Sequence, residues 1–318
     1  MKRSISTSLG TAVVRVLPAM SPATPGQKAP PWVFLHGASG SWRTFRAQMN
    51  QPHSRFDLVF LDLPGWGDSE VSGTFAVHQQ SRAVVEVLTS LGYRSWYLFG
   101  HSMGAVLALD IAASCPAETH AVLALSPTAL TAQTALSQPF RHPAMAPFVG
   151  MYVLMVLLRA FGRQSSVLLR HVERLGLLRL ILSPLFARPF SLRRQVFEDL
   201  AIDARPASFI AASSALRKYD AGIWRSIATP TVLARGSKDI FTRPAELHAL
   251  AALLPHAHAV VLADAGHFAH LEDPAAVSGL LSRLRPASDS LNGSDGRDNS
   301  TSSERDLGVT RRSGPGKP

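Results

Sequence analysis

The chain of 318 residues contains one cysteine, Cys115, so it cannot form an intrachain disulfide bond. It has no run of the roughly 20 consecutive apolar residues that are needed to cross a bilayer. The start, Met1-Lys2-Arg3, is followed by mostly polar residues rather than by the apolar core of a signal peptide. Together these absences favour a reducing compartment, and we expect a cytoplasmic protein.

Signatures of metal and cofactor binding are absent as well. We find no group of His, Cys, Asp and Glu with metal-ligand spacing and no glycine-rich phosphate loop. The chain carries 32 Lys and Arg against 22 Asp and Glu, a net charge of +10, but aromatic residues do not interleave with the basic ones as in nucleic-acid motifs. We therefore expect no metal, no other cofactor and no nucleic-acid partner.

Short apolar runs alternate with helix-period segments along most of the chain, which has 46% hydrophobic residues. Such alternation is typical of an α/β protein with a mostly parallel sheet. The alternation of strand and helix patterns is interrupted at residues 128–215, which we interpret as an inserted helical cap. Residues 1–127 and 216–286 then form the core, and the polar residues 287–318 are predicted to be a disordered tail.

The pentapeptide Gly100-His101-Ser102-Met103-Gly104 carries the main chemical signal. It follows a short apolar strand pattern at 95–99 and precedes a helix pattern at 105–113. A serine between two glycines at such a junction is a nucleophile elbow, which exposes the hydroxyl above the sheet edge. The glycines are needed there because a Cβ would clash where strand and helix cross.

A nucleophilic serine needs a base and an acid, which follow such an elbow in the order acid, then histidine. His267 is our candidate base, since Gly266 suits a loop that presents the next side chain after the strand at 259–263. His270 is the alternative. Asp239, after the strand at 230–236, is the candidate acid, with a helix N-cap as its alternative role. The strand at 121–125 ends in Ser-Pro and offers no competing carboxylate.

Acyl transfer also requires donors for an oxyanion. We expect one from the backbone N–H of Met103, the residue after the nucleophile. The second is expected from Ala38, in the loop His36-Gly37-Ala38-Ser39-Gly40 that follows an early strand. An ordinary turn between strand and helix is the alternative interpretation of this loop.

In this order and spacing, the motifs resemble the α/β-hydrolase superfamily over about residues 5–285. The resemblance also rests on the segment 62–69, Asp-Leu-Pro-Gly-Trp-Gly-Asp-Ser, whose acids we interpret as fixing the loop. It implies an α/β-hydrolase fold of the esterase and lipase branch, with a helical cap inserted after the strand that follows the elbow helix. Ser102 distinguishes the chain from epoxide hydrolases and haloalkane dehalogenases, which use Asp at the elbow.

The cap region is rich in leucine and arginine, with ten arginines, no lysine and four acids between residues 128 and 215. A continuous helix would carry Arg159, Arg163, Arg170 and Arg174 on one face. One interpretation is a cap that packs its apolar face on the core. The other is an apolar lid that also contacts an anionic membrane surface. Side chains expected to line an apolar substrate pocket are those of Trp42, Trp66, Met103, Met151, Met155 and Phe268.

These patterns predict a serine hydrolase that cleaves carboxylic esters with an apolar or lipid-like part through an acyl-enzyme. Other acyl chemistry on the same three residues is an alternative: a thioesterase, amidase, acyltransferase, C–C hydrolase or perhydrolase. A non-catalytic receptor or accessory protein on the same fold is the alternative from another class. The oligomeric state is left open.

Overall fold

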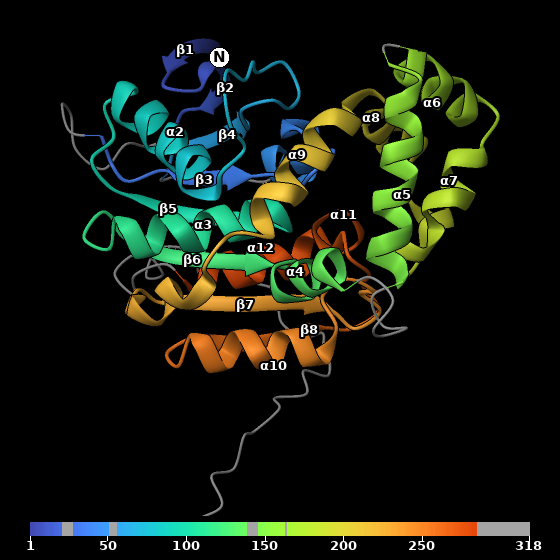
Figure 1. Ribbon diagram of the computed structural model, residues 1–318. Helices are drawn as coiled ribbons and strands as arrows, with labels where there is room; N and C mark the ends of the chain where they lie inside the picture. Colours follow the sequence, from blue (N-terminus) through green and yellow to red (C-terminus); the bar gives the residue numbers. More distant parts are fainter. Residues whose placement is uncertain (21–27, 51–55, 139–145, 163, 285–318) are drawn as a thin grey trace, which may run out of the picture.

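The computed structural model describes residues 1–20, 28–50, 56–138, 146–162 and 164–284. Its centre is an eight-stranded sheet with the order β1-β2-β4-β3-β5-β6-β7-β8 (Figure 1). The pairs β1–β2 and β2–β4 are antiparallel and all other neighbours are parallel, which confirms the predicted mostly parallel sheet. The strands are β1 (Lys2–Thr7), β2 (Gly10–Leu17), β3 (Trp32–Leu35), β4 (Leu58–Asp62), β5 (Trp96–His101), β6 (Thr119–Leu125), β7 (Thr231–Gly236) and β8 (His258–Leu262).

The central strands are buried on both faces, so their sequences are continuous apolar runs, with polar residues only at the ends of β4 and β5, rather than alternating. Successive side chains of β3 still enter opposite faces. Val33 and Leu35 join one core, whereas Trp32 and Phe34 join the other, which is rich in aromatic rings. The sheet therefore separates two hydrophobic cores, and helices must cover both.

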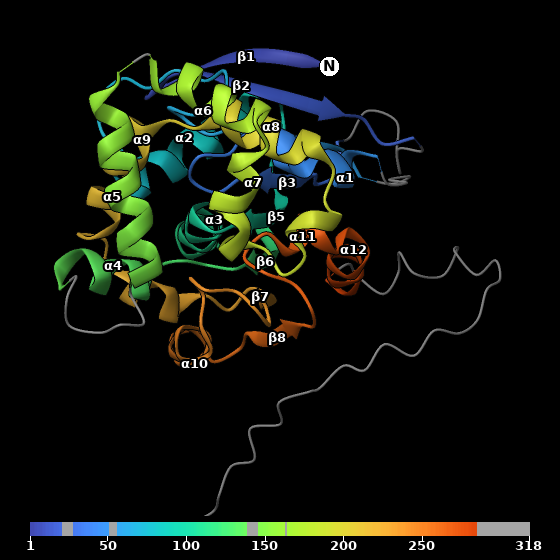
Figure 2. The ribbon, with the colours of Figure 1, turned by 90° about the vertical axis from the view of Figure 1, so that its right-hand side faces the viewer.

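Helices pack on each face accordingly (Figure 2). The core that contains Val33 is covered by α2 (Val77–Ser90), α3 (Met103–Ser114) and α10 (Pro244–Leu253). The core that contains Phe34 is covered by α12 (Pro274–Arg283) and by the 3₁₀ helix η1. The smaller helices of these layers are η1 (Trp42–Phe45), α1 (Arg46–Met49), η5 (Ala221–Ser226) and α11 (Ala269–Glu272).

A helical insertion separates β6 from β7, where the sequence predicts a cap. Figure 1 shows its helices α5, α6 and α7 beyond the end of the sheet toward which the arrows of β6 and β7 point. The tail predicted at 287–318 lies outside the described residues. The inserted helices are α4 (Leu130–Ser137), α5 (Ala146–Ala160), α6 (Gln164–Arg174), α7 (Leu177–Leu182), η3 (Ser183–Leu185), η4 (Pro189–Ser191), α8 (Arg194–Asp203) and α9 (Pro206–Leu216).

The continuous helix considered for residues 159–174 is not formed. Helix α5 ends at Ala160, Gly162 adopts a φ of 52°, and α6 begins at Gln164. Glycine permits this left-handed turn, which periodicity alone does not reveal. In the described residues no single helix is long and apolar enough to cross a membrane; α5 and α6 meet that test only as a pair, and they are bent by 118°.

Replacement of Phe34 tests whether the aromatic core stabilises the fold. Its ring stacks on Phe60 at 4.4 Å and meets Phe45 and Phe99 edge-on, each at 5.4 Å. Phe34→Ala should lower the free energy of unfolding by about 3–5 kcal/mol, because it removes buried surface and leaves a cavity. Phe190→Ala is the matched control: that ring is 66% exposed, and its loss should change stability by less than about 0.5 kcal/mol in urea denaturation. Equal effects of the two substitutions would contradict this assignment of the core.

Candidate functional site

Ser102 occupies the turn between β5 and α3 with φ 54° and ψ −116°, a backbone conformation that is strained for a residue other than glycine. A Cβ added to Gly100 would lie 2.2 Å from the carbonyl oxygen of Gly104. One added to Gly104 would lie 2.1 Å from that of Leu35. Both glycines are therefore sterically required, as the crossing of strand and helix predicts.

His267 and Asp239 are brought together at the ends of β8 and β7. The imidazole Nδ1 lies 3.1 Å from both carboxylate oxygens of Asp239, and the backbone N–H groups of Phe241 and Thr242 donate to Oδ1 at 2.8 and 3.0 Å. Burial tends to raise the pKa of Asp239, but His267 and these hydrogen bonds outweigh it and hold the pKa below its ordinary value. The charged carboxylate thus keeps the proton on Nδ1 and leaves Nε2 as the basic nitrogen.

The loop that carries His267 is held by backbone hydrogen bonds to the insertion. The N–H of His267 donates to the carbonyl of Leu185 at 2.8 Å. Glu272 accepts from the N–H groups of Gly266 and Ala187, at 2.6 and 2.7 Å. One carboxylate therefore joins the histidine loop to the segment after η3.

The alternative histidine, His270, lies in a different environment. Its ring is fully buried, with its centroid 4.4 Å from that of His101. Burial, together with the neighbouring His267, lowers the pKa of His270 to about 3, so this ring is neutral at ordinary pH. His270 is not among the residues that line the cavity described next, whereas His267 is.

Ser102 and His267 line one cavity of about 310 Å³, which lies between the sheet and the inserted helices. The Ser102 hydroxyl lies 3.4 Å from that of Thr128, which donates to the carbonyl of Ser126 at 3.2 Å. Thr128 lies three residues after the end of β6, in a segment where the sequence showed no carboxylate, and we made no prediction for it. The one sequence feature that could have indicated Thr128 is its place after a strand parallel to the one that precedes the elbow.

Ala38 and Met103, the predicted oxyanion donors, also line this cavity. The loop that contains Ala38 is closed by a hydrogen bond from the N–H of Gly40 to the carbonyl of Gly37, and Ser39 takes a φ of 59°. Within the described residues neither the Ala38 nor the Met103 N–H donates a hydrogen bond to the protein. Two backbone donors beside Ser102 are thus available to an oxygen atom in the cavity.

The remainder of the cavity wall is apolar. Met151, Met155 and Phe268, which the sequence predicts as pocket residues, all line it. Phe241 was missed, although its ring stands edge-on to His267 at 4.9 Å. Phe148 was missed as well, because an apolar run does not reveal which of its members face inward. The cavity suits a hydrocarbon group next to a hydroxyl and an imidazole.

Trp42 and Trp66 do not line the cavity, and the prediction is corrected for both. Trp42 lies on η1, where the guanidinium carbons of Arg15 and Arg46 approach its ring at 4.1 and 4.7 Å. Trp66 is completely buried, and it meets the rings of His36 and Phe75 edge-on at 6.5 Å. Both indoles stabilise loops, a role that sequence position does not distinguish from binding.

The model of the alpha/beta hydrolase fold family matches residues 30–274. The chain belongs to this family. It is 32% identical to Epoxide hydrolase 4 of Mus musculus over 99 residues, which are 29% of this chain and 26% of that protein. It is 37% identical to 2-succinyl-6-hydroxy-2,4-cyclohexadiene-1-carboxylate synthase of Citrobacter koseri over 91 residues, 27% of this chain and 34% of that protein. The matched part thus spans about a quarter to a third of these relatives.

Among solved structures, the esterase EaEST from Exiguobacterium antarcticum resembles this α/β-hydrolase with a TM-score of 0.68. The superposition covers 90% of this chain and 100% of that chain at 18% identity. At this identity the likeness concerns the fold, and the chemistry must be argued from the residues themselves.

Two buried polar side chains fix the loops of this α/β-hydrolase beside the elbow. His36 Nδ1 donates to the carbonyl of Gly37 at 2.8 Å, and its Nε2 accepts from the N–H of Leu63 at 3.0 Å. Asp62 accepts from the N–H groups of Trp42 and Asp68 at 3.0 and 3.2 Å. The acid at position 62 thus fixes a loop, as its motif predicts.

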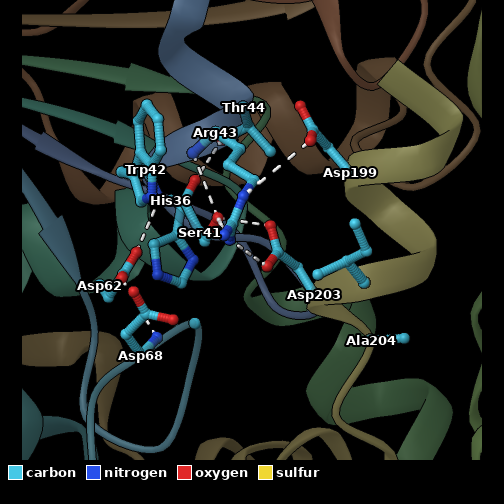
Figure 3. Close-up of polar contacts among 12 residues, drawn as sticks. His36, Ser41, Trp42, Arg43, Thr44, Asp62, Asp68, Asp199, Asp203 and Ala204 are labelled. Atoms are coloured by element: carbon cyan, nitrogen blue, oxygen red, sulfur yellow. Dashed lines mark hydrogen bonds and ion pairs between the residues drawn. The ribbon is translucent and has the colours of Figure 1, made fainter. Parts of the chain in front are cut away.

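A polar cluster connects helix α8 of the insertion to the loop that bears Ala38 (Figure 3). Ser41 follows that loop and caps η1, and its hydroxyl donates to Asp203 at the end of α8. Arg43 donates to the same carboxylate at 2.8 Å, and Arg46 donates to Asp199 at 2.8 Å. Asp203 is 1% exposed, so this contact is shielded from water.

Burial raises the pKa of Asp203 to about 6, and it outweighs the hydrogen bond from Ser41 and the charge of Arg43, which lower it. The neighbouring carboxylates of Asp62 and Asp199 also raise it. Folded protein therefore holds this proton more tightly than unfolded protein, in which the pKa is near 3.8. Protonated Asp203 therefore contributes to the free energy of unfolding. This contribution is complete below about pH 4 and is lost as the pH rises through about 6.

Asp203→Asn tests this assignment, because an amide stays neutral at every pH. Between about pH 5 and about pH 7.5, wild-type stability should fall relative to that of the variant by about 1 kcal/mol. Urea denaturation of both proteins at both pH values measures the difference, and the other titrating groups cancel in it. A difference that does not depend on pH, or one that changes in the opposite direction, contradicts the raised pKa.

Proposed function

We propose that this α/β-hydrolase cleaves carboxylic esters with an apolar acyl or alcohol part. The observation that carries the proposal is the apolar cavity, whose polar wall includes Ser102 and His267 beside the N–H groups of Ala38 and Met103. Acyl transfer needs this combination: a nucleophile, a base held by an acid, and donors for the developing oxyanion. Serine rather than aspartate at the elbow favours it over epoxide opening.

The reaction follows from the positions of these groups. Ser102 Oγ bonds to the ester carbonyl carbon while its proton moves to Nε2 of His267. The carbonyl oxygen becomes negative and accepts hydrogen bonds from the Ala38 and Met103 N–H groups. The C–O bond to the alcohol then breaks, and His267 returns the proton to that alcohol. Water then attacks the carbonyl carbon of the acyl-enzyme and gives its proton to His267. The bond between this carbon and Ser102 Oγ breaks, His267 returns the proton to Oγ, and the carboxylic acid is released.

Asp239 and Phe241 support the imidazole of His267 in different ways. Asp239 holds the imidazole with Nδ1 protonated and stabilises the imidazolium while Ser102 attacks. Phe241, edge-on to that imidazole, shields it from water on one side.

A fluorophosphonate probe tests whether Ser102 is activated. It should label the wild-type protein, whereas Ser102→Ala should abolish labelling and His267→Ala should slow it by at least about 10³-fold, since the base is lost. Ser102→Ala should also lower kcat for a soluble ester by about 10⁴–10⁶. Mass spectrometry of the labelled peptide identifies the site.

Ser90→Ala and His256→Ala are the controls, because both side chains are exposed and lie outside the cavity. They should label at the wild-type rate. No labelling of folded wild-type protein would refute the enzymatic proposal and favour the non-catalytic alternative. Labelling without turnover of esters, but with turnover of thioesters or amides, would refute the ester assignment alone.

The cavity wall predicts a preference for hydrocarbon chains. Met155→Trp should fill part of the cavity and lower kcat/KM for a long-chain p-nitrophenyl ester by at least about tenfold, while that for the acetate changes less than about threefold. Val156→Trp is the matched control, since this neighbouring side chain is exposed and lies outside the cavity. An equal loss with both esters, or the same loss in the control, would contradict a chain-binding role for this wall.

A further inference from the structure

Exposed apolar side chains concentrate on the inserted helices. Most of the large hydrophobic residues exposed in the described part of the chain lie between Val153 and Ile181, on α5, α6 and α7 and in the segments that join them. Figure 2 shows these helices together on the side of the molecule that faces the viewer. We call their exposed surface the outer face; it includes Leu157, Phe161, Val167, Leu175, Leu180 and Ile181. A concentration of exposed apolar side chains often marks a surface that contacts a partner or a membrane.

The charges of the outer face have one sign. Arg159, Arg170 and Arg174 are exposed, and they form no ion pair with an acid of the described residues. Residues 146–193 contain a single acid, Glu173, and this side chain is buried and accepts two hydrogen bonds from Arg194, at 3.0 and 3.2 Å. The surface therefore presents apolar groups and guanidinium groups without an exposed carboxylate.

Helical spacing intermixes the two kinds of side chain. Val156 and Arg159 are three residues apart on α5, and Val167, Arg170 and Arg174 lie at positions i, i+3 and i+7 on α6. Residues at these spacings share one side of a helix. Arginines therefore stand beside the exposed apolar side chains, as they do in helices that lie in a membrane interface.

The outer face is continuous with the cavity. Leu168 and Ile181 are 38% and 51% exposed, and both also line the cavity that contains Ser102. An apolar chain can therefore remain in contact with hydrocarbon side chains from the outer face to the elbow. Part of the cavity wall therefore lies on the same helices as the exposed arginines.

We propose that the outer face of α5, α6 and α7 docks on the surface of an anionic phospholipid membrane. Its apolar side chains enter the boundary between headgroups and acyl chains, and Arg159, Arg170 and Arg174 bind phosphate groups. A second copy of this chain fits less well, because a two-fold contact of this face with itself brings guanidinium groups together without carboxylates to neutralise them.

Vesicle co-sedimentation tests the proposal independently of catalysis. The full chain carrying Ser102→Ala is mixed with vesicles of phosphatidylcholine alone, or with vesicles that contain about 30% phosphatidylglycerol. Partitioning should be at least about tenfold stronger on the anionic vesicles, and it should weaken as NaCl is raised from about 0.05 to about 0.5 M. Equal partitioning on both, or none on either, overturns the proposal and leaves the proposed ester chemistry untouched.

Two triple variants in the same background separate apolar from electrostatic binding. Leu157→Ser/Phe161→Ser/Val167→Ser removes apolar groups that are 54–59% exposed and lie outside the cavity. Arg159→Gln/Arg170→Gln/Arg174→Gln removes three charges and should weaken partitioning on anionic vesicles roughly a hundredfold. The matched control, Arg82→Gln/Arg94→Gln/Arg217→Gln, lowers the net charge equally with exposed arginines from other elements and should weaken it less than about threefold.

Circular dichroism and thermal unfolding establish that each variant is folded. With Ser102 restored, the apolar variant should hydrolyse a soluble short-chain ester at the rate of the wild type. If the control weakens partitioning as much as the outer-face variant does, binding depends on net charge and the proposal fails. It also fails if light scattering finds a dimer that the apolar variant dissociates, since the occupant is then a second copy.

Discussion

The close approach of two backbone segments at the elbow determines the geometry of the whole site. Because Gly104 has no side chain, the start of α3 lies directly against the carbonyl of Leu35 at the end of β3. The loop that follows β3 is thereby brought beside Ser102: a Cβ on Gly37 would lie 3.0 Å from that of Ser102. The proposed nucleophile and the two proposed oxyanion donors thus come from elements whose separation is set by van der Waals contact and not by flexible side chains.

Local patterns were sufficient to predict the features that depend on local physics. Buried strands are recognisable as short apolar runs, and the strands expected at 95–99, 121–125, 230–236 and 259–263 and the helix expected after the elbow all occur near their predicted ranges. Ser102 was selected by its glycine-flanked elbow, and Asp239 and His267 because each follows a later strand; parallel strands end at one edge of the sheet. The hydrogen bonds between Asp239 and His267 agree with that reasoning.

The residues that were missed or misplaced depend on packing between distant segments. Trp42 and Trp66 were expected in the pocket because of their chemistry, yet arginines and a buried histidine surround them. Phe241 and Phe148 face the cavity for reasons that appear only when the sheet and the insertion are assembled. The division of α5 from α6 depends on a left-handed glycine at position 162, and an apolar run does not encode which of its sides will meet the core.

The hydrogen bonds around Glu272 have a consequence for how such proteins can diversify. The Glu272 carboxylate and the carbonyl of Leu185 join the histidine loop to the end of the α7–η3 segment. On the side of the insertion, only backbone groups take part, so these hydrogen bonds do not depend on which side chains the segment carries. The side chains of Leu185 and Ala187 can therefore change while these hydrogen bonds are kept. If the insertion is exchanged between related proteins, however, these hydrogen bonds to the histidine loop must be preserved. A chimera whose junction replaces the segment around Leu185 would receive the cavity-lining residues of another protein. It would also lose the hydrogen bond from the N–H of its own His267 to the carbonyl of Leu185.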